Sequence, residues 1–186
     1  IKYEVRAPKV RQMQDLFTRV VDVAKGAALM TGTQMRFDVT MAFSDYLPNK
    51  TLAAVMDECL RSAGAPDWEE ADYKLAADFL RSYSKNTLVN IQEELTEYFD
   101  PNELDEALMA PVDKTVHPFN PRETRYESGS TDVGDVGYVT PTVMLHVATA
   151  CLGNVGHTWQ NTAFSCSSIG MKGMLRAAQV MAMACV

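Results

Sequence analysis

The chain has 186 residues, of which 47% are apolar and 22% are charged, and its formal net charge is −7 at pH 7. This composition is typical of a globular protein and excludes an intrinsically disordered chain. No apolar run of the sequence is long enough to span a bilayer. The negative charge argues against nucleic acids and anionic membrane surfaces as partners, because both attract clustered Lys and Arg.

Four cysteines occur in the sequence, and none of them forms a Cys-x-x-Cys pair. Because they lie within apolar patterns, buried free thiols in a reducing cytosol are the simplest interpretation. No signal peptide is recognisable, and we expect a cytoplasmic protein. The sequence starts at Ile1 inside a strand-like pattern and stops at Val186 inside a helical one, so we expect a piece that is cut at both ends.

The first part of the chain predicts a β-α-β unit. Apolar and polar or small residues alternate over 1–6 and again over 35–43, as they do in half-buried strands. Between these segments, apolar residues recur at helical spacing over 8–31, and Gly32 is expected to cap the end of that helix.

A break at 47–49 suggests a domain boundary, with one domain over 1–47 and another over 48–186. The second domain is expected to contain several helices, a buried strand and a long irregular segment. One helix is predicted over 51–62, and a second follows an N-cap at Asp67 with Glu70 as its capping-box partner. Two further helices are predicted over 88–98 and from Ser167 or Ser168 onward. The strand is predicted over 138–150 and the irregular segment over 100–128. The expected fold class is α/β, or α+β.

A glycine-rich stretch from Ser128 to Gly137 has two interpretations. It is either a turn in which Asp132 and Asp135 bond local backbone N–H groups, or a nest of N–H groups that binds an anionic substrate group. It is not a P-loop, because no Gly-Lys-Ser/Thr follows.

Three histidines are the other candidates for chemistry. His146 lies in an apolar segment and is expected to be a buried core residue, while His117 is expected to lie exposed in a loop. His157 follows two glycines and precedes Trp159, so a metal ligand or an acid–base role is open to it. From spacing alone, a structural role remains the default for each of them.

Five stretches taken together resemble the second half of the co-catalytic zinc exopeptidase and amidohydrolase family. This family includes aminoacylase, succinyl-diaminopimelate desuccinylase and the indole-acetyl-amino-acid hydrolases, and the resemblance points to its p-aminobenzoyl-glutamate hydrolase branch. The Gly-Ser-Thr-Asp-Val-Gly-Asp-Val string with a downstream His-Thr-Trp is the most specific part. The stretches are 3–8, 26–33, 44–49, 129–136 and 156–160.

The resemblance implies a two-domain subunit, in which a lid with a four-stranded sheet and two helices interrupts an α/β catalytic domain and mediates dimerisation. Residues 1–47 would be the second half of the lid, and 48–186 the returning part of the catalytic domain. The family binds two divalent metals, zinc or manganese, and most of the ligands and the general-base glutamate come from a half that is not in this sequence. No catalytic residue is therefore expected here.

The resemblance also assigns roles to particular residues. His157 matches a metal ligand, and Ser130, Thr131 and Asp132 fall on the loop that contacts the substrate carboxylate. Arg6 matches a lid arginine that reaches the substrate.

The leading hypothesis is therefore part of a metal-dependent amidohydrolase acting on a small N-acyl amino acid such as p-aminobenzoyl-glutamate. Its partner would be a second copy or a sister subunit. The piece alone should be inactive, because a hydrolytic zinc needs about three protein ligands. Two alternatives remain open. One is a non-catalytic dimerisation or interaction module, and the other is a regulatory domain that binds a small molecule.

Overall fold

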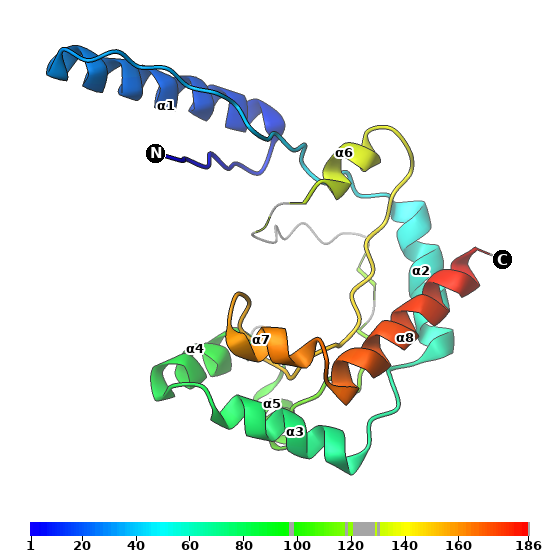
Figure 1. Cartoon of the computed structure of the whole chain (residues 1–186). Coiled ribbons are helices and arrows are strands. Elements are labelled where there is room, and N and C mark those ends of the chain that lie inside the picture. Colours follow the sequence, from blue (N-terminus) through cyan, green and yellow to red (C-terminus); the bar gives the residue numbers. More distant parts are fainter. Residues whose placement is uncertain (97–98, 118, 121–128, 130, 186) are drawn as a thin grey trace. The chain divides into compact units, whose positions relative to one another are not determined.

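The computed structural model describes residues 1–96, 99–117, 119–120, 129 and 131–185. Within these residues the regular secondary structure is helical (Figure 1). The helices are α1 (Val10–Thr31), α2 (Lys50–Ala63), α3 (Glu70–Arg81), α4 (Lys85–Leu95), α5 (Pro101–Met109), α6 (Val133–Gly137), α7 (Trp159–Phe164) and α8 (Ser168–Ala184). No β-strand occurs in this part of the chain, so the expected α/β or α+β fold class, with its β-α-β unit, is wrong.

The segments predicted as strands have no regular secondary structure. Residues 1–7, 33–49 and 141–149 form no ladder with any described residue. A strand needs a neighbouring strand to satisfy its backbone N–H and C=O groups, whereas alternation reports only that one side of an extended segment is apolar. Phe37 and Val39, on one such segment, are accordingly 52% and 61% exposed.

The described chain divides into two compact units. The first comprises Ile1–Leu52 with Asn120–Val143, and the second comprises Ala53–Phe119 with Met144–Val186. The assignment of the two parts of the chain to a lid and a catalytic domain stays a prediction. None of the described helices has the length and the hydropathy needed to cross a membrane.

In the first unit, the chain that follows α1 covers one face of that helix. Met13 and Phe17 are half-buried on this face. The chain runs back beside the helix (Figure 1), and the ring of Phe37 meets the ring of Phe17 edge-on at a centroid distance of 5.8 Å. Gly32 caps the helix in the left-handed conformation with φ 64°, which confirms the predicted end of the helix.

The second unit is organised around two hydrophobic clusters. The first joins α3, α7 and α8, and the second joins α3, α4 and the turn between them. The buried members are Ala76, Val112, Cys151, Phe164 and Ile169 in the first cluster, and Leu80, Tyr83, Ile91 and Leu95 in the second.

Helix α3 begins later than the sequence suggested. Its N-cap is Glu69, whose N–H group donates to the Asp72 carboxylate at 2.9 Å, and not the predicted Asp67. Asp67 instead accepts a hydrogen bond from the guanidinium of Arg176 on α8 at 3.1 Å. Asp67 therefore contacts α8 and does not cap α3.

The cysteines are free, but they are not all buried. Cys151 is buried, and its burial raises the pKa of its thiol to about 11. Cys166 and Cys185 are exposed, so the prediction of a buried thiol is wrong for these two.

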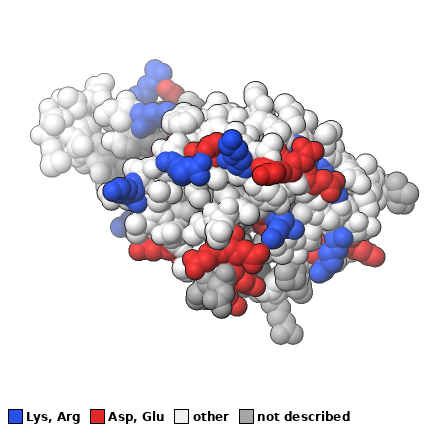
Figure 2. All heavy atoms as spheres, turned by 90° about the horizontal axis from the view of Figure 1, so that it is seen from below, with Lys and Arg blue, Asp and Glu red and all other residues white. Residues whose placement is uncertain are grey.

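Acidic and basic side chains are interspersed on the face of the molecule shown in Figure 2. Elsewhere in the described chain, ion pairs occur within one turn of a helix, such as Lys25 with Asp22 at 3.0 Å and Arg81 with Asp78. Exposed pairs of this kind contribute about 0–1 kcal/mol each, so they contribute mainly to solubility.

Candidate functional site

Part of the glycine-rich stretch forms a short helix. Asp132 precedes α6, and the hydroxyl of Thr131 accepts a hydrogen bond from the N–H group of Val133 at 3.3 Å. Thr131 and Asp132 are both exposed, so their polar groups can reach a ligand from solvent. Ser130, the third residue predicted to contact substrate, lies outside the described residues.

Helix α6 is anchored to a distant part of its own unit. The N–H group of Ser44 donates to the Asp135 carboxylate at 2.9 Å, across 91 positions of sequence. Gly134 lies so close to the same residue that a Cβ atom would stand 2.2 Å from the carbonyl oxygen of Ser44. Only glycine allows this approach, and the carboxylate of Asp135 bonds a distant residue rather than a local one.

Asp45 joins α6 to the start of α1. Its carboxylate accepts hydrogen bonds from the Lys9 ammonium at 2.8 Å, the Val10 N–H group at 3.2 Å and the Tyr138 hydroxyl at 3.2 Å. The hydrogen bond from Lys9 lowers the pKa of Asp45 below its ordinary value, although partial burial opposes the shift. The sequence alone did not single out Asp45, because its partners lie 35 to 93 positions away.

Arg6 lies in the same unit as Thr131 and Asp132. Its guanidinium donates to the Glu4 carboxylate at 2.7 Å, which lowers the pKa of Glu4, and the Arg6 side chain is 60% exposed. Within the described residues, no hydrogen bond joins Arg6 to either predicted substrate-binding residue. The pair with Glu4 is a weak surface interaction that a carboxylate ligand can displace.

His157 belongs to the other unit and lies in the turn before α7. Its backbone is left-handed, with φ 59°, and its side chain is exposed. The next residue, Thr158, caps α7 by accepting a hydrogen bond from the N–H group of Asn161 at 3.3 Å. The turn therefore presents the imidazole to solvent from a helix start that is well defined.

The other two histidines have different surroundings. His146 is exposed on the irregular segment over 141–149, so the prediction of a buried core histidine is wrong. His117 is exposed, as predicted, and its Nε2 lies 2.7 Å from the Asp113 carboxylate. Neither histidine belongs to the second unit's two buried clusters.

The described residues offer a metal ion single donors rather than a cluster of ligands. Among the described residues, no group of three or more His, Cys, Asp or Glu side chains is arranged to hold a metal ion. The exposed imidazole of His157 is chemically suited to be one ligand of zinc, whereas manganese prefers oxygen ligands. A hydrolytic zinc needs about three protein ligands, so the remaining donors would have to come from outside this set.

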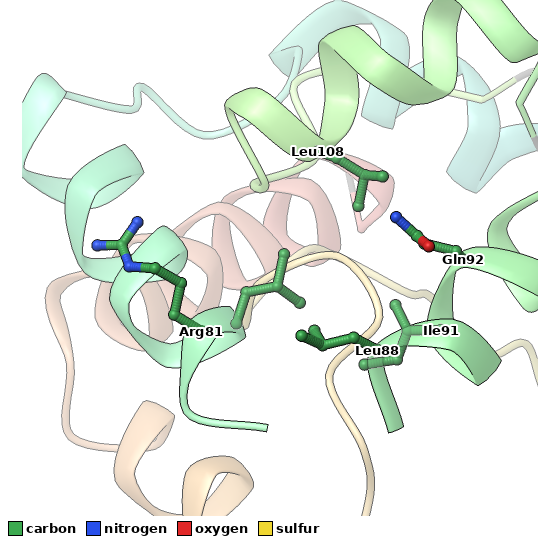
Figure 3. A pocket seen from close by; sticks show the side chains of 6 residues that line it. Arg81, Leu88, Ile91, Gln92 and Leu108 are labelled. Atoms are coloured by element: carbon green, nitrogen blue, oxygen red, sulfur yellow. The ribbon is translucent and has the colours of Figure 1, made fainter. Parts of the chain in front are cut away.

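A small apolar hollow in the second unit contains none of the predicted site residues. It has a volume of about 210 Å³, and its walls come from α3, α4 and α5 (Figure 3). The guanidinium of Arg81 turns away from the other labelled side chains (Figure 3), and it forms an ion pair with Asp78. Binding sites for small molecules usually contain several polar groups that point inward and fix the orientation of the ligand. We therefore do not propose a catalytic or binding site in this hollow. The lining residues are Leu80, Arg81, Leu88, Ile91, Gln92 and Leu108.

Comparison with known proteins gives one informative match. Over 185 residues, or 98% of this chain, the sequence is 32% identical to one subunit of the p-aminobenzoyl-glutamate hydrolase of Escherichia coli (strain K12). The chain spans 38% of the length of that protein. No protein-family model matches, and no solved structure matches. The match confirms that the chain resembles a segment of a p-aminobenzoyl-glutamate hydrolase subunit, as the sequence motifs predicted.

Proposed function

Because this chain is a relative of a segment of a p-aminobenzoyl-glutamate hydrolase subunit, we propose that it is part of a metal-dependent amidohydrolase. The substrate would be a small N-acyl amino acid, such as p-aminobenzoyl-glutamate. The observation that carries this proposal is the identity of 32% over almost the whole chain to a protein named as a hydrolase.

His157 would supply one ligand of a divalent metal, zinc or manganese. Two such metals, when bound, polarise the amide carbonyl and lower the pKa of a bound water. The role of His157 in this scheme is to hold its imidazole in place, and its exposed position on a defined turn supports that role. The other ligands and the general-base glutamate would come from a part of the protein outside this chain, so the chain alone would be inactive.

Thr131 and its neighbours would bind the carboxylate of the substrate. The Thr131 hydroxyl is an exposed hydrogen-bond donor, and Ser130 would act in the same way. Asp132 would contribute through its backbone, because its carboxylate repels that of the substrate. Arg6 would leave Glu4 and form a charge-assisted pair with the substrate, which is stronger than a neutral hydrogen bond.

The first unit would also form contacts with another subunit. The relative is named as one subunit of its hydrolase, which supports a sister subunit, and a second copy of this chain is the other partner that we consider. Exposed apolar side chains on the first unit favour association, among them Leu29 at 83% and Met30 at 84% exposure. The same side chains favour the second candidate function, a module that only dimerises.

The test is hydrolysis of p-aminobenzoyl-glutamate by the complete protein that contains this chain. We expect release of p-aminobenzoate and glutamate, loss of turnover after chelation, and recovery when zinc or manganese is added back. The 186-residue chain alone should release neither product. Turnover that is insensitive to chelation would contradict the proposal, and so would a complete protein that stays inactive on N-acyl amino acids after metal is restored.

A further inference from the structure

The turn that carries His157 contains two residues in the left-handed backbone region. These are Gly153, with φ 68°, and His157 itself, with φ 59°. Few residues other than glycine adopt this conformation, although histidine does so more often than most. Groups of the surrounding structure hold the turn in place.

The hydroxyl of Tyr83 is such a group. It donates to the Asn154 side-chain oxygen at 3.2 Å and accepts from the Val155 N–H group at 3.1 Å, across 71 and 72 positions of sequence. Tyr83 belongs to the second hydrophobic cluster, and the residue is only 9% exposed. The side-chain amide of Asn154 in turn donates to Asn161 on α7 at 2.7 Å. The hydroxyl thus connects the turn to the core and, through Asn154, to α7.

The other end of the turn is fixed by packing. Gly153 lies against Ile91 of α4, and a Cβ atom added to Gly153 would stand 2.1 Å from the Ile91 Cγ2 atom. Ile91 is only 2% exposed, so the residues packed around it restrict its movement, although it also lines the hollow in Figure 3. The turn is therefore held at Gly153 by packing and at Asn154 and Val155 by the Tyr83 hydroxyl.

The imidazole of His157 has no comparable support of its own. Within the described residues, no hydrogen bond to its ring nitrogens is present. Metal-binding histidines are usually oriented by a hydrogen bond to the second ring nitrogen, and its loss costs metal affinity. Here the direction of the ring depends on the backbone of the turn.

We infer that Tyr83 is a positioning residue for His157. It fixes the two residues that precede Gly156 and His157, and so directs the imidazole toward a metal. This inference rests on the proposed function, in which His157 is a metal ligand.

The experiment compares Zn²⁺ binding by the complete protein and its Tyr83→Phe variant, by competition with a chromophoric chelator. We expect the dissociation constant to rise by about 10- to 100-fold, as it does when groups that orient a ligand are removed. The visible spectrum of the Co²⁺-substituted protein should change as well, because it reports ligand geometry rather than stability. The matched control is Tyr73→Phe on α3, which loses the same hydroxyl from a ring that packs on the first cluster. It should bind Zn²⁺ as the wild type does.

The outcomes separate this inference from the proposed function. If His157→Ala leaves Zn²⁺ affinity unchanged, His157 is not a ligand and both fail. If His157→Ala weakens binding but a folded Tyr83→Phe protein matches the wild type in affinity and Co²⁺ spectrum, only the role of Tyr83 is refuted. If Tyr83→Phe does not fold, Asn154→Ala decides by the same two criteria, because it removes one partner of the hydroxyl and leaves the ring in the core.

Discussion

Asp72 is the most deeply buried charge in the described part of the chain, and its replacement should destabilise the protein strongly. Its side chain is 1% exposed. It accepts hydrogen bonds from the Lys172 ammonium at 2.6 Å, the Glu69 N–H group at 2.9 Å and the Ser168 hydroxyl. The carboxylate therefore joins the first turn of α3 to the first turns of α8.

The size of the stability loss depends on the groups that lose their partner in Asp72→Ala. Removing one partner of a buried ion pair costs about 3–5 kcal/mol, because the other charge stays buried without compensation. Lys172 is 27% exposed and lies 3.5 Å from Glu69, so it can reach water and a second carboxylate. We therefore expect Asp72→Ala to lower the free energy of unfolding by about 3 kcal/mol, the lower end of this range. Asp72→Asn keeps the shape of the side chain and should cost less.

Unfolding in guanidinium chloride, followed by tryptophan fluorescence, measures this cost. Trp68 packs against the first hydrophobic cluster and donates to the Asp113 carbonyl at 2.8 Å, so its emission should report loss of the α3–α8 contact. Adding Lys172→Met to Asp72→Ala should cost little further, because the short ion pair is already lost and only the longer contact with Glu69 is removed. A loss below about 0.5 kcal/mol for Asp72→Ala, which is usual for an unimportant surface residue, would refute the reasoning.

Three further predictions concern pH, packing and substrate. Burial by itself would raise the pKa of Asp72, but the hydrogen bonds from Lys172 and its other partners outweigh burial and lower it. The stability due to Asp72 should therefore be complete above pH about 4 and disappear as the pH falls through the lowered pKa, so acid titration of Asp72→Asn should show a shallower loss. Gly134→Ala should cost about 1–3 kcal/mol in thermal unfolding, because its Cβ meets the Ser44 backbone, and an unchanged melting temperature would contradict this packing. Thr131→Val should raise KM for carboxylate-bearing substrates about 10- to 100-fold, the effect of one lost hydrogen bond to a charged group, and an equal KM would exclude Thr131 from the site.

Local signals predicted the helices well where capping and periodicity agreed. Ser167 caps α8 through the Gly170 N–H group, and α2 lies within one residue of its predicted bounds at each end. Helix α5 was missed, although Asp100, Pro101 and Glu103 form a recognisable start of a helix. Here the helix signal was in the sequence, but the surrounding prolines and charges favoured an irregular segment.

The failed strand predictions have a different cause. Alternation in the first unit predicted strands where the structure has no regular secondary structure, because strand pairing is a long-range property that no local pattern contains. The same limit applies to the candidate site. The motif singled out His157, whose role stays a prediction, whereas Tyr83 and Asp45 were not singled out, because their partners lie 35 to 93 positions away.

The most direct test of the account is turnover of p-aminobenzoyl-glutamate by the complete protein with and without the His157→Ala substitution. The account predicts that turnover falls by more than about 100-fold, since groups that merely orient a metal ligand already contribute 10- to 100-fold. Helical content should be unchanged, because the imidazole is exposed and outside both hydrophobic clusters. Turnover within a few-fold of the wild type, in a folded protein that holds its metals, would contradict the assignment of His157.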